Sequence, residues 1–505
     1  MRRFFNKLLR DFKTTSSARG GRGAPRRASL QVEGLEDRLV LSTAKLVGTT
    51  LEVVASPGTV NHLRQITFQA DPHKAGFLDV LDDGILLGGK PFAISAIKNV
   101  TVGVAGFDSV TVDDSNGLPF ATGVNVSLFG KGTSNSLNVT GSRPFTPGSL
   151  EGYTAGDGAI DGSLATLAGN TFQFSNAISS VTDSIRSDGI LTDAFGSKVT
   201  LSDSSGVTQK LSGMSIGGAG DTFTYKNKGF VGLGLDSANA SASLNATAVA
   251  AGEQTFSVAL RGNDASVDIK ATPSNVETDV LAGGVSLSNT SRVNLEANSG
   301  VVKISGGSAT TVTVGQAAAA GTLVTSGIKA NVSVAGVGVL TVDDSGNGRT
   351  QENVKVTEST ISGTGLFGNN AVTLTYTNPP GATLSLVTGQ LADTYAIAGS
   401  KPGANFSSQI EITGESKMGL SVAVTLDAES GLNLELTNVH PGHPVPASLS
   451  ITALGGTFSR VPPSVPIGIE DVTFPGGLLS EIGYDGFNNV TLFNGVPHFT
   501  RVTNS

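Results

Sequence analysis

Two pairs of adjacent carboxylates, Asp113/Asp114 and Asp343/Asp344, are the residues best suited to bind a metal ion. Each pair follows an alternating apolar segment and precedes Ser and Gly. Neighbouring carboxylates with loop carbonyls supply the oxygen ligands that Ca²⁺ prefers, and a divalent ion would relieve their repulsion. Adjacent residues on a strand point to opposite faces, so both carboxylates reach one ion only if the turn begins there. The pairs therefore predict either calcium sites or solvated Asx turns.

A glycine-rich segment, Gly217-Gly-Ala-Gly-Asp221-Thr-Phe223, is a third candidate. It resembles the RTX-type calcium nonapeptide, Gly-Gly-x-Gly-x-Asp-x-apolar-x, but lacks one residue between Gly220 and Asp221. The resemblance implies calcium bound by Asp221 between stacked copies of the motif. The chain has a single imperfect copy, which cannot complete six to eight ligands. The alternative interpretation is a relic turn.

The remaining composition points away from catalysis. The 505 residues include no Cys or Trp and five His, beside 66 Gly. Active sites depend on His, Cys and clustered carboxylates in a defined pocket. The sequence contains no Gly-x-Ser-x-Gly elbow, phosphate-binding loop or His-Glu-x-x-His motif. We therefore expect a non-enzymatic protein with no cofactor other than Ca²⁺.

Positive charge is concentrated at the N-terminus. The formal net charge of the whole chain is −8. Residues 1–27 carry a net charge of +8, from nine Lys and Arg against Asp11, so residues 28–505 carry −16. An acidic body argues against nucleic acid as a partner, because phosphate contacts require a basic face. Residues 1–13 place apolar side chains at helical spacing among basic ones. This pattern predicts a short amphipathic helix that contacts a membrane surface transiently during export, and the alternative is a disordered basic tail.

The segment Leu35-Glu-Asp-Arg-Leu-Val-Leu-Ser42 follows this basic stretch. It resembles the LEPR-XLL segment near the N-terminus of large secreted or surface β-rich bacterial proteins, although Asp37 stands where that pattern has Pro. The resemblance covers about eight residues and implies an extracellular or cell-surface destination. The alternative is a short linker helix before the first strand.

From residue 46 onward the chain alternates short Val-, Ile- and Thr-rich segments with small polar turns. Branching at Cβ favours extended backbone, so the chain is predicted to be all-β. The segment at 110–117 recurs at 340–348, and the residues upstream of each copy are also similar. Repeated strand-and-corner units favour a parallel β-helix, or β-solenoid, of irregular coils. The alternative is a row of tandem antiparallel β-sandwich domains.

The repeats and the Pro-rich stretch predict six regions. They are a basic targeting segment with the LEDRLVLS motif (1–45), an N-terminal β repeat unit (46–145), a central β region with an insertion (146–326), a second β repeat unit (327–440), a Pro-rich linker (441–466) and a C-terminal β segment (467–505).

These features favour a secreted or cell-surface structural or adhesion scaffold, with cell-envelope or extracellular-matrix components as partners. The first alternative is a carbohydrate-active β-helix enzyme, either a polysaccharide lyase or a glycoside hydrolase, which needs only two carboxylates, or calcium and a basic residue. The second is a calcium- or glycan-binding module. The lack of Trp disfavours a sugar cleft with aromatic platforms.

Overall fold

The computed structural model describes residues 42–485. The ranges it leaves out of this span are 57–62, 131–134, 142–149, 156–161, 166–169, 176–177, 205–207, 215–221, 283–289, 319–320, 349–351, 402–403, 415–419, 428–430, 439–446, 457–471, 474–476 and 479–480.

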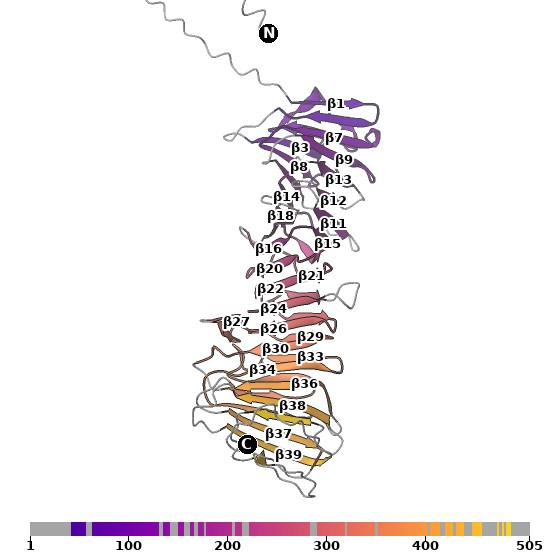
Figure 1. Cartoon of the computed structure of the whole chain (residues 1–505). Coiled ribbons are helices and arrows are strands. Elements are labelled where there is room, and N and C mark those ends of the chain that lie inside the picture. The colour runs from indigo at the N-terminus through magenta and orange to yellow at the C-terminus, as the bar shows by residue number, and fades with distance from the viewer. Residues whose placement is uncertain are drawn as a thin grey trace, which may run out of the picture. The chain divides into compact units, whose positions relative to one another are not determined.

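The described chain is all-β, and no α-helix occurs among the described residues. Two sheets contain nearly all of the strands, and Figure 1 labels them along the chain. Sheet 1 contains β1 (Thr43–Val47), β2 (Thr50–Val54), β7 (Asn99–Val104), β9 (Asn125–Gly130), β11 (Leu150–Ala155), β12 (Gly162–Ala165), β13 (Thr171–Ser175), β15 (Ser187–Ala194), β19 (Lys228–Leu235), β21 (Thr255–Leu260), β23 (Glu277–Ala282), β25 (Val302–Gly306), β29 (Val332–Ala335), β31 (Asn353–Val356), β32 (Thr360–Thr364), β33 (Thr373–Thr377), β35 (Asp393–Ala398), β37 (Leu420–Asp427), β39 (Ala447–Gly456), β40 (Val472–Thr473) and β41 (Gly477–Leu478).

Sheet 2 contains β3 (Arg64–Ala70), β4 (Phe77–Asp82), β5 (Ile85–Leu86), β6 (Phe92–Ala93), β8 (Asp108–Asp113), β10 (Ser136–Thr140), β14 (Ser180–Asp183), β16 (Lys198–Asp203), β17 (Gln209–Ser212), β18 (Thr222–Tyr225), β20 (Ser241–Asn245), β22 (Ser266–Ala271), β24 (Ser291–Leu295), β26 (Thr310–Val314), β30 (Val339–Asp343), β34 (Ala382–Val387), β36 (Asn405–Gly414), β38 (Gly431–Asn438) and β42 (Glu481–Asp485). Two short 3₁₀ turns, η1 (Leu87–Gly89) and η2 (Ile94–Ala96), and a hairpin of β27 (Gln316–Ala317) and β28 (Leu323–Val324) complete the described elements.

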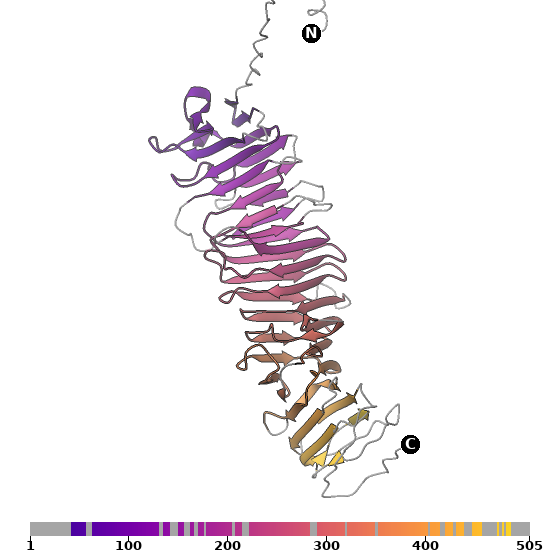
Figure 2. The same ribbon diagram turned by 90° about the vertical axis from the view of Figure 1, so that its left-hand side faces the viewer.

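Beyond the antiparallel strands β1 and β4–β6 at the N-terminal end, the chain passes between the two sheets, and most strands pair in parallel with a strand one coil away. In sheet 1, for example, β19, β21, β23 and β25 follow one another in parallel register, while β20, β22, β24 and β26 do so in sheet 2. Figure 2 shows these strands stacked in the order of the chain. The predicted solenoid is therefore confirmed. These strands do not form tandem antiparallel sandwiches, because the pairing between coils is parallel.

Three antiparallel inserts interrupt this regular order. In sheet 1, β9 pairs with β13 rather than β11, and the series then runs β13–β12–β11–β15. The same reversal occurs in sheet 2 as β14–β18–β17–β16–β20 and again in sheet 1 as β29–β33–β32–β31–β35. Each insert inverts the chain order of three strands while a parallel partner remains on either side. The solenoid therefore continues through the inserts.

The core lies between the sheets, because alternate residues of each strand face inward. Leu51, Val100, Val126 and Phe172 occupy matching register positions in four successive strands of sheet 1, and each is at most 1% exposed. Burying one such side chain contributes roughly 1.5–3 kcal/mol. One connected apolar cluster extends from Ala44 to Val422. Stacked coils, rather than separate domains, thus provide the core.

The two strong sequence copies occupy equivalent strands. Residues 110–113 end β8 and residues 340–343 end β30, both in sheet 2, and each strand is preceded by a sheet 1 strand, β7 or β29. Strand β39 lies inside the segment predicted as a Pro-rich linker, 441–466. The targeting segment is outside the described residues except for its last few positions, and the six predicted boundaries remain predictions.

Candidate functional site: buried polar residues at one corner

Buried polar side chains gather where the chain leaves a sheet 2 strand and enters the next sheet 1 strand. We call this place the polar corner. Its buried members include Asp114, Glu151, Asp183, Ser187, Lys228, Glu253, Thr272, Asn298, Asp344, Glu352 and Asp393. Several of them bind the backbone of the turn itself. Thr272 Oγ1, for example, accepts hydrogen bonds from two backbone N–H groups, and the Asn298 amide donates to two carbonyls. The side chains of the polar corner thus provide hydrogen-bond partners for turn backbone groups that become buried when one coil stacks on the next.

The two predicted carboxylate pairs lie at this corner, and the members of each pair have different surroundings. Asp113 and Asp343 are half-buried, and each accepts a hydrogen bond from the backbone N–H two residues later, at 2.9 Å. These contacts are those of Asx turns. Asp114 and Asp344 are buried, at 7% and 1% exposure. The turn begins at these second residues, because their carbonyls accept from the N–H three residues later.

Asp344 belongs to a cluster of three buried carboxyl groups. Its Oδ1 accepts from the N–H and the hydroxyl of Thr325, at 2.5 and 3.0 Å. The backbone N–H of Glu352 donates to Asp393 Oδ1 at 2.8 Å. Burial, followed by a hydrogen bond to Asp344 and the charges of Asp344 and Asp393, raises the pKa of Glu352 to about 11. Burial raises the pKa of Asp393 to about 6. Glu352 is therefore protonated at neutral pH.

A hollow of about 870 Å³ opens beside this cluster. Its lining includes Asp344, Asn347, Phe367 and Asn370, from the turns that follow β30 and β32. Asn347 also donates to the Glu352 carboxyl at 3.2 Å, which connects the hollow to the buried cluster. Carboxyl, amide and aromatic groups therefore meet on this surface.

A second cluster surrounds a fully buried lysine at the start of β19. The Lys228 ammonium donates to Glu151 Oε2 and to the carbonyl of Ile185, and it lies 3.0 Å from Asp183 Oδ1. All three ionisable side chains are 0% exposed. Ser187 donates to Glu151 Oε2 at 2.8 Å. Burial, then the charge of Asp183, raises the pKa of Glu151 to about 8. Burial lowers the pKa of Lys228, but the two carboxyl groups outweigh it and the net shift is upward.

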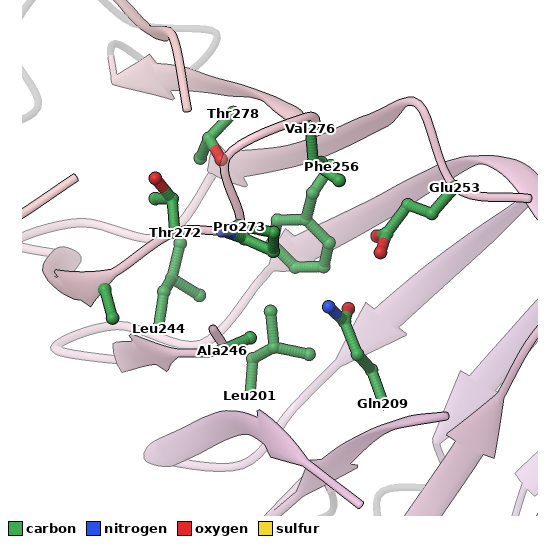
Figure 3. Close-up of a pocket in the computed structure, with 11 residues that line it drawn as sticks. Leu201, Gln209, Leu244, Ala246, Glu253, Phe256, Thr272, Pro273, Val276 and Thr278 are labelled. Carbon is green, nitrogen blue, oxygen red and sulfur yellow. The ribbon is translucent and has the colours of Figure 1, made fainter. Parts of the chain in front are cut away.

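A third cluster lies one turn further along the solenoid. The Tyr225 hydroxyl donates to Gln209 Oε1 at 2.6 Å and lies 3.4 Å from Glu253 Oε1. Figure 3 shows the Glu253 carboxyl and the Gln209 amide pointing toward one another beside apolar walls that include Phe256 and Leu201. The cavity between them is about 10 Å³, close to the least space that one water molecule needs. It is too small for an organic ligand.

The structure brings Asp344 together with two carboxyls that the sequence did not suggest, Glu352 and Asp393. It does not test the calcium prediction at Asp113, Asp114, Asp343 and Asp344, which stays a prediction. Within the ranges described above, no group of three or more His, Cys, Asp or Glu side chains is arranged to hold a metal ion. Asp221 and most of the RTX-like segment lie outside the described residues.

The cluster around Lys228 was not found by sequence reasoning. Glu151, Asp183 and Lys228 are far apart in the chain, and none stands in a recognisable motif. The one local signal is that Lys228 is the first residue of an otherwise apolar strand, where charge is uncommon.

Comparison with known proteins does not assign this chain to a family: no family model, curated protein or solved structure matches it. In the described part of the chain, no helical segment has the length and hydropathy that a membrane-crossing helix requires.

Proposed function

We propose that this chain is a secreted or cell-surface structural protein, a non-catalytic β scaffold for adhesion or assembly. The observation that supports this proposal is the polar corner. Its buried polar groups contact turn backbone and, around Lys228, one another, within a solenoid whose apolar core continues from coil to coil. Such residues stabilise a stacked architecture, and they leave the strand faces free for contact with other molecules.

The LEPR-XLL-like segment and the basic stretch before it support the destination. In this proposal residues 1–13 contact a membrane surface transiently during export, and the acidic body then meets cell-envelope or extracellular-matrix components.

Cell fractionation with an antibody against the chain tests the destination. We expect the full chain in the envelope or the culture medium, and we expect protease added to intact cells to degrade it. The variant Arg38→Ala, in the LEPR-XLL-like segment, should retain the chain inside the cell, whereas the neighbouring basic variant Arg22→Ala should not. Full-length protein found only in the cytosol would refute the proposal.

A second candidate function is a carbohydrate-active enzyme or a glycan-binding module. The hollow beside Asp344 favours it, because carboxyl, amide and aromatic groups can orient a sugar ring. A panel of acidic polysaccharides separates the candidates through the appearance of new chain ends. Turnover that is lost in Asp344→Asn would replace the scaffold proposal with an enzyme. Binding measured by calorimetry without turnover would indicate a glycan-binding module.

A further inference from the structure

The Lys228 cluster holds an amine against two carboxyl groups in a place closed to water. Lys228 Nζ lies 3.0 Å from Asp183 Oδ1 and also contacts Glu151 Oε2, and no part of these three side chains is exposed. One oxygen of each carboxyl, Glu151 Oε1 and Asp183 Oδ2, is buried without a hydrogen-bond partner. Buried charges normally acquire full hydrogen bonding. Other buried carboxyls, such as Asp344 and Asp393, also have one such oxygen, so what distinguishes this cluster is the fully buried amine between its two carboxyl groups.

Aromatic rings close off one side of the cluster. Tyr153 lies two residues after Glu151 on β11 and therefore faces the same interior. Tyr225 is the register partner of Asp183. Phe223 stacks between the two tyrosines, with ring centroids 4.9 Å from Tyr153 and 6.0 Å from Tyr225. Water exclusion favours neutral groups over charged ones and disfavours hydrolysis.

We propose that Lys228 and Asp183 condense into an intramolecular isopeptide bond, with Glu151 as the proton carrier. The ammonium first passes a proton to Asp183 across the 3.0 Å contact, which leaves a neutral amine beside a neutral carboxyl. Nζ then attacks Cγ of Asp183. Glu151 gives its proton to the departing oxygen and recovers one from Nζ. The N–C bond forms, the C–O bond breaks, one water molecule leaves and Glu151 ends as it began.

The two carboxyl groups are distinguished by their neighbours. Asp183 Oδ1 faces the ammonium and accepts the backbone N–H of Ile185 at 3.2 Å, so Oδ1 receives the lysine proton and becomes the departing oxygen. The Ile185 N–H stabilises the charge on Oδ1 as the C–O bond breaks. Glu151 Oε2 accepts from both Lys228 and Ser187, so its proton resides on the other oxygen. Its raised pKa of about 8 keeps it protonated at neutral pH. Asp183 is therefore the electrophile and Glu151 the acid. Holding the amine and carboxyl together replaces an encounter in solution.

The bond would join the two sheets where the chain order is least regular. Asp183 ends β14 in sheet 2, and Lys228 begins β19 in sheet 1. The inserts β11–β13 and β16–β18 lie on either side of β14 and β15 in the chain. A covalent bond between Asp183 and Lys228 would close the loop that contains the second insert, in a chain that has no Cys for a disulfide.

Mass spectrometry of the purified full chain tests the bond directly. We expect proteolysis to release a branched peptide that contains Asp183 and Lys228 and is lighter than its two parts by one water molecule. Unlinked peptides at both positions in the unmutated chain would overturn the proposal. A branch from Lys228 to Glu151 would overturn the assignment of roles. Neither measurement depends on a variant that folds.

Variants then test the roles. Glu151→Gln should slow the condensation at least about 100-fold, because general acid–base catalysis contributes 10²–10⁴-fold. Lys228→Arg should abolish the bond, whereas Lys226→Arg, in the same turn, should leave it intact. Asp183→Asn should give the same branched peptide with loss of ammonia instead of water. A bond that forms equally well in Glu151→Gln would refute the proton-carrier role. This outcome is independent of the location of the protein, so it does not bear on the scaffold proposal.

Discussion

Glu253 offers a quantitative test of how the polar corner contributes to stability. Its side chain is at the turn between β20 and β21, and the residue is 5% exposed. Burial raises its pKa to about 7, against the opposing effects of a backbone hydrogen bond at Ala250 and the Tyr225 hydroxyl. The variant Glu253→Gln keeps the shape of the protonated side chain and cannot ionise. It therefore isolates the cost of charging this carboxyl inside the solenoid.

The expected magnitude follows from the difference between the folded and unfolded pKa values. The ordinary pKa is 4.5 and the folded pKa is about 7, and each unit corresponds to about 1.4 kcal/mol, so the effect is roughly 3 kcal/mol. The folded chain holds this proton more tightly than the unfolded chain. The contribution of Glu253 is therefore fully present below pH 4.5 and is lost as the pH rises through about 7.

Urea unfolding at pH 5 and pH 9 measures the effect as a difference between the variant and the unmutated chain. Other buried carboxyls titrate in both proteins, so their contributions cancel. We expect the free energy of unfolding of Glu253→Gln, relative to the unmutated chain, to increase by roughly 3 kcal/mol from pH 5 to pH 9. Glu296→Gln, a half-buried glutamate on the following coils, serves as the control and should show no comparable change. An equal difference at both pH values would refute the reasoning.

Two further predictions concern the turns. In Gly262→Ala the new Cβ would lie 2.0 Å from the carbonyl oxygen of Ser237, so the free energy of unfolding should fall by about 1–3 kcal/mol or more, whereas Gly307→Ala, with no atom within 4 Å, should change it little. Thermal denaturation of both variants checks this, and equal melting temperatures would contradict it. If the acid pairs bind calcium, millimolar calcium should raise the melting temperature, and the double variant Asp113→Ala/Asp343→Ala should remove that shift. No shift in the unmutated chain would refute the calcium prediction.

The strands could be predicted because half-buried strands carry a local signal. The alternating segments at Val100 and Leu137 became β7 and β10, and the one at Val301 became β25, beginning one residue later. The corner was also visible, because Asp and Ser next to Gly favour a tight turn in any β architecture. In the structure, the strand that follows such a corner pairs with a strand of the adjacent coil. These signals identified the class of fold and the position of Asp113 and Asp343.

The antiparallel inserts could not be predicted, because alternation is the same in parallel and antiparallel strands. Phe172 and Phe223 each belong to an insert, yet their neighbours show the same pattern as those of Val126 in a regular coil. The partners of Lys228 were hidden for a related reason. The inverted strand order decides which residues from separate coils become neighbours. The sequence of a single segment does not reveal that order.

This inversion explains why charged residues are tolerated in the core at that place. A regular coil repeats its corner, so a polar side chain there meets the same turn in the next coil and can bind its backbone, as Thr272 does. Between two inserts the stacked corners come from strands that are not consecutive in the chain, and Glu151, Asp183 and Lys228 meet there instead. A buried lysine balanced by two carboxyls is costly when any partner is missing. The same cost would penalise any other stacking order of these strands, because another order would separate the lysine from its carboxyl partners.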